Sequence, residues 1–281
     1  MLRGLISVAA GLVAACHLAM SPAEAAPAFS RIVSLNACAD QFLIALGLAD
    51  RIAALGPLAT DPVFSYYAKE AAALPVTDGS AESVLVLKPD LVLAGPFSGT
   101  LAKNVLRREG IHIEEVAIPQ TIAEARQQIL DVADLLGVAE RGRVLAAEFD
   151  AALAKVPAAG TRPSALYLQR RLFVTGTGTL VDELLDRAGF ANALEAAGLS
   201  GITRVDLERL AGIPADVLVL NGPATDAGDQ GAAVLQHPLI ERLFPAERRV
   251  MLPLATFVCG GPPLIEAIAT LSAARQRLEA R

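Results

Sequence analysis

Aromatic, basic and polar side chains follow the segments that are predicted to form strands. In the first half of the chain they are Asn36, Cys38, Asp40, Tyr66, Tyr67 and Phe97, and in the second half Arg170, Arg171, Thr177, Asn221, Phe257 and Cys259. Aromatic faces suit a planar macrocycle or a catecholate, and arginine suits an anionic chelate. Loops at the carboxyl ends of parallel strands form ligand crevices. We therefore expect these residues to line a ligand cleft, although each Tyr or Phe fits core packing equally well.

Two cysteines remain if an N-terminal segment is removed after export. Cys38 and Cys259 fall on predicted cleft loops, one in each half of the chain. In an oxidising compartment such a pair indicates a disulfide, but a bridge across the cleft would restrict ligand entry. Free thiols beside a metal chelate and buried inert cysteines are the alternatives. The sequence does not choose among the three.

Bare-metal binding and phosphate binding are both disfavoured. Beyond the N-terminal segment the histidines are His112 and His237, and neither has a partner at the spacing of a metal site. Thr175-Gly176-Thr177-Gly178 lacks the third glycine of a dinucleotide fingerprint, because position 181 is Val, and no Walker lysine follows. We predict a tight strand-to-helix turn there. The chain also shows no Ser-His-Asp set and no cofactor motif, so no catalytic residues are predicted.

One pattern occurs twice and places a glutamate near the start of a short helix each time. Glu82 lies eight residues before Asp90, and Glu208 lies eight residues before Asp216. Each aspartate runs into an apolar stretch, so each copy predicts a short helix, a turn and a buried strand. The helix macrodipole by itself favours an acidic residue in a first turn.

A second pair of similar segments supports a duplication. Residues 40–47 and 182–189 both run from Asp to Gly over an apolar-faced helix, and each precedes one copy of the glutamate pattern. The period exceeds a hundred residues, which is too long for a solenoid. It predicts two similar lobes with a cleft between them, where a ligand would bind.

The alternation of strands and helices predicts an α/β fold with a mainly parallel sheet and flanking helices in each lobe. The expected lobes are 27–120 and 161–281, and the predicted strands are 31–35, 91–94, 111–116, 165–168, 217–220 and 250–252.

Residues 121–160 are helical in composition and join the lobes. Breaks at Gly137 and Gly142 predict two helices, the second from about Arg141 to Val156. Lobes joined by a long backbone helix should close only slightly around a ligand, because a helix resists bending.

The composition excludes one class of partner, and the N-terminus predicts a location. The net charge is -6 and no basic stripe occurs, so nucleic-acid binding is not expected. Residues 1–26 have a positive start, an apolar run and the small-residue site Ala23-Glu24-Ala25, which predicts a cleaved signal peptide and a periplasmic protein. Val13-Ala14-Ala15-Cys16 also fits a lipoprotein box, so anchoring through Cys16 is the alternative.

An ordered set of segments resembles the class III substrate-binding proteins of ABC importers, the group with a helical backbone between its lobes. The segments are 31–35, 46–52, 81–93, 175–183, 189–192 and 259–262, and the resemblance covers nearly all of 31–278. Ala215 separates Pro214 from Asp216, whereas the family usually has Pro directly before Asp. The spacing from Glu208 to Asp216 is retained, so this departure changes a turn and not the position of the glutamate.

The resemblance implies a monomeric receptor that binds a metal chelate between its lobes and has no enzymatic activity or cofactor. It also implies that Glu82 and Glu208 dock into arginine pockets on the permease, where two distant carboxylates would fix the orientation. Among chelates we favour a ferric siderophore over cobalamin, for which the lack of Trp is unfavourable, and cobalamin over haem. The competing hypothesis is a two-lobed enzyme such as a tetrapyrrole-metal chelatase, against which the export signal argues.

Overall fold

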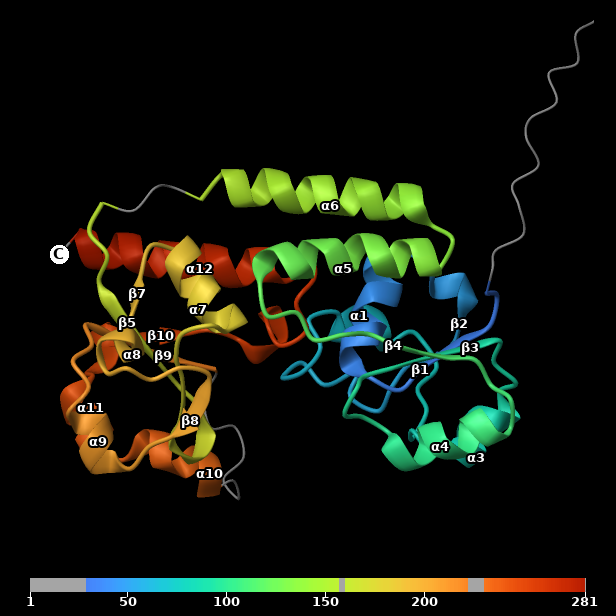
Figure 1. Ribbon diagram of the computed structural model, residues 1–281, viewed down its shortest axis with the longest axis horizontal. Helices are drawn as coiled ribbons and strands as arrows, with labels where there is room; N and C mark the ends of the chain where they lie inside the picture. The colour runs from blue at the N-terminus through green and yellow to red at the C-terminus, as the bar shows by residue number, and fades with distance from the viewer. Residues whose placement is uncertain (1–28, 157–159, 222–229, 281) are drawn as a thin grey trace, which may run out of the picture.

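The first half of the chain forms a wholly parallel sheet. A computed structural model describes residues 29–156, 160–221 and 230–280, and in it two sheets lie side by side beneath a layer of long helices (Figure 1). The first sheet has the order β2-β1-β3-β4. Its strands are β1 (Ile32–Ser34), β2 (Ile52–Ala54), β3 (Leu91–Ala94) and β4 (Ile113–Glu115). β1 and β3 are completely buried, as expected for continuous apolar runs covered on both faces.

Helices make the crossovers of this sheet. They are α1 (Ala37–Ala45), α2 (Ala68–Ala71), α3 (Ala81–Val86) and α4 (Thr100–Arg108), with the 3₁₀ turn η1 (Ala49–Arg51) before β2. Asn36 and Ser80 begin α1 and α3, since each side chain accepts a hydrogen bond from backbone N–H groups of the first turn. β1, β3, β4 and the helix that contains Glu82 therefore lie where the sequence predicts them, whereas the sequence analysis did not predict β2.

The second sheet is mixed. Its order is β10-β9-β5-β6-β8, and β7 pairs with β5 beside β6. The strands are β5 (Ser164–Leu168), β6 (Phe173–Thr175), β7 (Ala191–Asn192), β8 (Ile202–Arg204), β9 (Val217–Leu220) and β10 (Arg249–Met251). β5, β7, β9 and β10 are parallel, but β6 is antiparallel to both β5 and β8. The sequence did not predict this antiparallel addition.

Helices and 3₁₀ turns surround the second sheet. The α-helices are α7 (Leu180–Arg187), α8 (Ala193–Ala196), α9 (Leu207–Ala211), α10 (Gln230–Ala233), α11 (Pro238–Leu243) and α12 (Leu264–Glu279). The 3₁₀ turns are η2 (Arg170–Leu172), η3 (Val234–Gln236), η4 (Ala246–Arg248) and η5 (Leu254–Thr256). In the part of the chain that the structure describes, no helix is long and apolar enough to cross a membrane.

The duplicated aspartates perform the same structural task in each half. Asp90 Oδ2 accepts hydrogen bonds from the backbone N–H of Ser30 at 2.7 Å and from its hydroxyl at 2.9 Å. Asp216 Oδ2 accepts the same pair from Ser164 at 2.8 and 2.9 Å. Each aspartate thus ties the start of one strand to the start of its parallel neighbour. The two halves are similar lobes, as the sequence repeat predicts.

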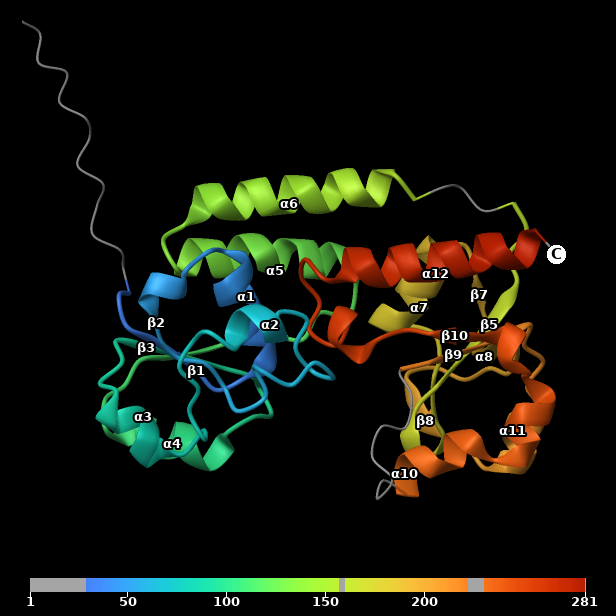
Figure 2. The same cartoon turned by 180° about the vertical axis from the view of Figure 1, so that it is seen from behind.

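Two long helices connect the lobes. α5 (Ile122–Leu135) and α6 (Ala139–Ala154) pack against each other, and α6 also contacts α12 of the second lobe (Figures 1 and 2). Gly142 lies inside α6 and does not interrupt it, contrary to the prediction. A Cβ atom there would lie 2.3 Å from the Cβ of Ala133. Glycine therefore lets α6 approach α5 closely, and the helix begins two residues earlier than expected.

Arginines satisfy the carbonyl groups at the ends of several of these helices. Both terminal nitrogens of Arg51 donate to Leu136 O at 2.9 Å beyond α5, and Arg141 Nη1 donates to Leu46 O at 3.1 Å beyond α1. Arg275, only 2% exposed, donates to Ala188 O beyond α7. Helix C-termini leave four carbonyls without intrahelical partners. Each arginine comes from another element, so these hydrogen bonds also fix neighbouring elements to one another.

The segment after η5 brings the backbone of the second lobe against the first. Gly260 and Gly261 have φ angles of +67° and +66°. A Cβ atom on Gly260 would lie 2.3 Å from Pro119 Cγ, and one on Gly261 would lie 3.0 Å from Phe42 Cζ. Phe42, Tyr167 and Phe257 belong to one core cluster, which therefore includes residues from both lobes. We call the contact of residues 259–262 with the first lobe the seam.

We predict that Gly260→Ala destabilises the protein much more than Gly198→Ala. Both glycines have positive φ, +67° and +65°, but only Gly260 has atoms within 4 Å of the new methyl group. Gly198→Ala should therefore cost about 1 kcal/mol of unfolding free energy, for the backbone strain alone. Gly260→Ala should cost a further ~1–3 kcal/mol for overpacking. Urea unfolding measures both, and equal losses would show that the seam tolerates a side chain at position 260.

Candidate functional site

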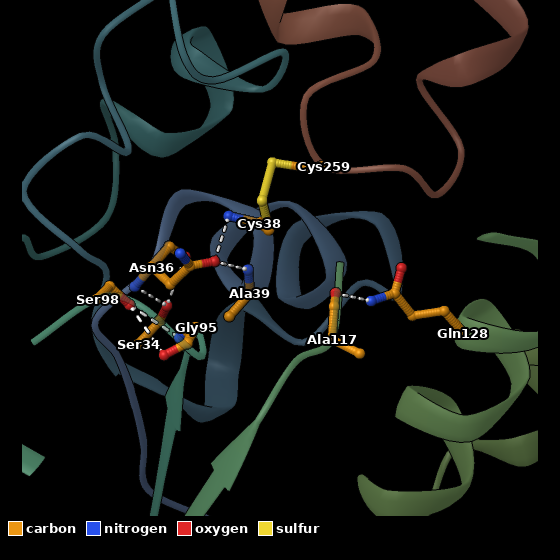
Figure 3. Close-up of a disulfide and its surroundings, with 9 residues drawn as sticks. All are labelled: Ser34, Asn36, Cys38, Ala39, Gly95, Ser98, Ala117, Gln128 and Cys259. Atoms are coloured by element: carbon orange, nitrogen blue, oxygen red, sulfur yellow. Dashed lines mark hydrogen bonds between the residues drawn. A yellow bond between two sulfur atoms is a disulfide. The ribbon is translucent and has the colours of Figure 1, made fainter. Parts of the chain in front are cut away.

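A disulfide joins the two lobes where the ends of their strands meet. Cys38 lies in the first turn of α1, directly after β1, and Cys259 lies in the loop that follows β10 and η5. Their Cα atoms are 4.9 Å apart across a sequence separation of 221 residues (Figure 3). The structure therefore selects the disulfide among the three alternatives that the sequence leaves open. The bridge lies at the seam.

Asn36 organises the loops beside this bridge. Its Oδ1 accepts hydrogen bonds from the N–H groups of Cys38 at 2.9 Å and Ala39 at 3.3 Å. A Cβ atom on Gly95 would lie 2.6 Å from Asn36 Nδ2, so the loop after β3 lies directly against the loop after β1 (Figure 3). Ser98 Oγ accepts from Gly95 N at 2.9 Å. Asn36 is half-buried and serves as the N-cap of α1.

Asp40 lies in the core and not on a cleft surface, contrary to the expectation. Its side chain is fully buried, and Oδ1 accepts a hydrogen bond from Gly56 N at 2.9 Å. Within the described residues its Oδ2 has no hydrogen-bond partner. Burial raises the pKa of this carboxyl to about 6. The sequence placed Asp40 at a helix start correctly, but it could not show that the side chain points inward.

Tyr66 and Tyr67 lie after the carboxyl end of β2, next to the second lobe. Their rings are edge-to-face with centroids 5.1 Å apart, and Tyr66 is 43% exposed. Burial raises the pKa of both phenols, that of Tyr67 to about 12. The negative charge of Glu266 contributes next to the raised pKa of Tyr66. Glu266 belongs to the first turn of α12, so the Tyr66 phenol lies near the second lobe.

The loop that carries Phe97 is held by a buried lysine. Phe97 is 86% exposed, in the connection between β3 and α4. Lys103 is 3% exposed, and its Nζ donates to Gly95 O at 2.9 Å, Pro96 O at 3.2 Å and Glu115 Oε1 at 3.0 Å. The sequence analysis did not identify Lys103, because a lysine in a helix next to Arg107 and Arg108 resembles an ordinary solvent-exposed residue.

Arg170 and Arg171 occupy the turn between β5 and β6. Gln169 N donates to Phe173 O at 2.7 Å, and both Arg171 and Leu172 have positive φ, 58° and 60°. Two successive left-handed residues form the tight turn that suits the twist of a hairpin, usually at Gly or Asn. Both arginines are exposed. The backbone oxygen of Arg171 accepts from Arg204 Nε at 3.2 Å, so β8 supports the turn.

Thr177 and Asn221, two further candidates of the second lobe, lie on different loops and are both partly exposed. Thr177 is half-buried and bridges to Ser200, and the following Gly178 has φ +76° before Thr179 begins α7. This is the tight strand-to-helix turn that the sequence predicts. Asn221 directly follows β9 and is partly exposed.

Phe257 is core and not cleft surface. It is 6% exposed and contacts the ring of Tyr167 edge-to-face, at 5.7 Å between centroids. Tyr167 was missed by the sequence analysis. Its hydroxyl has no hydrogen-bond partner among the described residues, and burial raises the pKa of the phenol.

Glu82 and Glu208 each lie beside a groove. The groove at Glu82 is about 460 Å³ and lies between the first turns of α3 and α4. The groove at Glu208 is about 600 Å³ and includes Arg204 and Asp206. Both glutamates are exposed, and α3 and α9 lie on the side of the molecule away from α6 (Figure 1). The duplication thus presents one carboxylate on each lobe along one side.

A hollow of about 500 Å³ lies between β4 and α5, and its lining comes from the first lobe and α5. The lining includes Pro119 and Gln128, which Gly260 of the second lobe approaches, so the hollow adjoins the seam. Among the described residues, no cluster of His, Cys, Asp and Glu could hold a metal ion. His112 contacts Glu114 at 2.8 Å and packs against Phe29.

Comparison with known proteins identifies the family. Residues 32–249 match the sequence profile of a family described as "Periplasmic binding protein". The chain therefore belongs to the periplasmic binding proteins, which are receptors and not enzymes. No curated protein sequence matches the chain.

Several solved structures are similar to the chain. One is the periplasmic haem-binding protein RhuT from Roseiflexus sp. RS-1, with 26% identity, a TM-score of 0.71, and coverage of 88% of this chain and 99% of that one. The vitamin B12-binding protein BtuF of Vibrio cholerae has 18% identity, a TM-score of 0.65, and coverage of 90% and 99%. An Fe³⁺-hydroxamate transport protein of Saccharomonospora viridis has 20% identity, a TM-score of 0.68, and coverage of 88% and 93%. The last two show the fold alone.

We predict that Asp40→Asn makes the protein more stable at neutral pH and alters its pH dependence. The folded state holds the Asp40 proton up to about pH 6, whereas the ordinary pKa is 3.8. Wild type therefore loses stability as the pH rises from about 4 to 6, by up to about 3 kcal/mol. Asn cannot ionise and can still accept from Gly56. Urea unfolding between pH 3.5 and 7.5 measures the difference.

The control for this prediction is Asp134→Asn, which changes an exposed carboxylate of α5. The difference in unfolding free energy between Asp134→Asn and wild type should stay nearly constant over the same pH range. If the difference in unfolding free energy between Asp40→Asn and wild type were also the same at every pH, the buried carboxyl of Asp40 would not titrate between about pH 4 and 6, and the prediction would be wrong.

Proposed function

We propose that the protein is the periplasmic receptor of an ABC importer and that it binds an iron chelate, foremost haem, beside the seam. The observation that carries the proposal is the similarity to the haem-binding RhuT at 26% identity over nearly its whole length, together with membership of the family. On the basis of this similarity we favour haem over the ferric siderophore that the sequence alone favoured. It also leaves no support for the chelatase alternative.

Exposed side chains on loops of the two lobes suit an iron porphyrin. Tyr66 is an exposed phenol near the second lobe, and phenolate oxygen is an axial ligand of haem iron in some proteins. Iron would replace the proton that the raised pKa retains on the free phenol. Exposed Phe97 offers an aromatic face, and Arg170 and Arg171 in the second lobe offer guanidinium groups for carboxylates. This assignment of ligand-binding residues is ours.

The ligand can be identified by titration with hemin, a ferric siderophore and cyanocobalamin, followed by absorbance and thermal shift. We expect hemin to bind and its Soret band to shift. Tyr66→Phe should weaken hemin binding about tenfold or more and change the charge-transfer absorbance, because the iron loses an oxygen ligand. The matched control is Tyr67→Phe, which removes the hydroxyl of the less exposed neighbour and should have a smaller effect. Binding of a corrinoid or siderophore but not hemin would refute haem as the cargo.

Delivery to a permease is proposed to depend on Glu82 and Glu208. Each carboxylate is exposed at a groove on the side away from α6, and each begins a short capped helix. Two distant charges on one rigid body favour one orientation on a partner with two basic sites. The export signal at 1–26, the lobe boundaries 27–120 and 161–281 with 121–160 between them, and the monomeric state remain part of the proposal. Residues 1–28 lie outside the described part of the chain.

Charge reversal tests this docking. We expect Glu82→Arg combined with Glu208→Arg to abolish binding to the permease and uptake, with hemin affinity unchanged, because the carboxylates lie away from the seam. Glu148→Arg, which reverses an exposed carboxylate on α6, is the control and should leave transport intact. Loss of ligand affinity in the double variant would instead place these glutamates in the ligand site.

A further inference from the structure

The face of the first lobe that contains Glu82 exposes several large apolar side chains. Leu101 is 84% exposed, Val86 is 80% exposed and Val105 is 40% exposed. Single exposed apolar residues need no explanation, but clusters of them on a monomer mark interaction surfaces.

These side chains form a continuous surface with Glu82. Glu82 and Val86 are one helical turn apart on α3, and Leu101 and Val105 are one turn apart on α4, so each pair shares one side of its helix. α3 and α4 contact each other, and Glu82, Leu101 and Val105 line the same groove of about 460 Å³. We call these four residues the α3–α4 face. It lies on the side of the molecule away from α6 (Figures 1 and 2).

The second lobe provides an internal comparison. Its groove contains Arg204 and Asp206 beside Glu208, and both of these side chains are exposed. One turn after Glu208 the chain has Gly212, where the first lobe has Val86 after Glu82. Both copies therefore have the acidic residue, but among the described residues only the helix of the first copy continues one turn later with an exposed apolar side chain, Val86. Near the second groove the exposed apolar residue is Ile202 of β8, which is 65% exposed. Packing of the first lobe does not require Val86 or Leu101, since each is at least 80% exposed, whereas Val105 is partly covered in the groove.

We propose that the α3–α4 face binds a periplasmic segment of the permease in which apolar side chains flank the basic residue that pairs with Glu82. The inference rests on the proposed delivery to a permease and specifies the chemistry of that contact. Glu82 requires a cation in the partner, which distinguishes it from a purely apolar occupant.

Paired polar substitutions test the proposal. Leu101→Ser with Val105→Ser should bind the nanodisc-reconstituted permease about tenfold more weakly or worse, since buried apolar anchors dominate such interfaces. Leu101→Met should bind like wild type. Val144→Ser changes a 51% exposed residue of α6 and is the matched control, expected within twofold of wild type. Leu101 is 84% exposed and Val105 is 40% exposed, so the double variant should stay folded with a slightly lower urea midpoint, and its hemin affinity should not change.

Salt dependence provides a second readout. Contacts between exposed charges weaken at high salt, whereas apolar contacts do not. Wild type should therefore retain measurable permease binding at about 0.5 M salt, where the Debye length is only a few ångströms and exposed charges are screened from one another. The Leu101→Ser, Val105→Ser variant should lose nearly all of it under the same conditions.

The outcomes separate this inference from the proposed function. If Glu82→Arg abolishes permease binding but the Ser variant binds within twofold of wild type, docking stands and the apolar surface does not contribute. If neither changes binding, both proposals are wrong. Protein-free vesicles of the nanodisc lipids are the remaining probe. Binding of wild type to them, lost in the Ser variant, would mean that the α3–α4 face contacts lipid and would overturn the inference.

Discussion

Residues 259–262 of the second lobe pack against the first lobe through two successive glycines, Gly260 and Gly261. The disulfide between Cys38 and Cys259 holds this contact in place. Gly260 lies against Pro119 at a distance that a methyl group could not occupy, and a methyl group on Gly261 would make a tight contact with Phe42. The core cluster that includes Phe42 and Phe257 draws residues from both lobes. A disulfide that closes a long loop mainly lowers the entropy of the unfolded chain. Together with the packing of α5 and α6 against the second lobe, this joint fixes how the loops of one lobe lie relative to the other.

Local patterns predicted the repeated parts of the fold well. Apolar runs located β1, β3, β5 and β9, because strands buried on both faces need continuous apolar sequence. The hairpin from β5 to β6 was not predictable, since its turn uses left-handed Arg171 and Leu172 where Gly or Asn would have signalled it. Gly142 was misread for a related reason. A glycine that permits close helix packing and one that ends a helix look the same in sequence.

The candidate site was predicted in part. The sequence located the loops that follow β1, β3, β5 and β9, because apolar runs mark those strands, and it placed Cys38 and Cys259 in opposite halves of the chain. It could not tell which side chains of a loop point outward. Asp40 and Phe257 are buried, whereas Phe97 and Tyr66 are exposed, and that difference depends on tertiary packing. Lys103 gave no signal, because its role arises only when its helix lies against the loop after β3.

The cysteine spacing has a consequence for biogenesis. Cys38 and Cys259 are separated by 221 residues, so a chain that crosses a membrane from its N-terminus delivers one sulfur long before the other. In a chain exported in this way, Cys38 would remain a free thiol, open to oxidation, until nearly the whole polypeptide had been translocated. Maturation therefore ends with a covalent closure that only a complete molecule can make, and truncated products would remain marked by an unpaired cysteine.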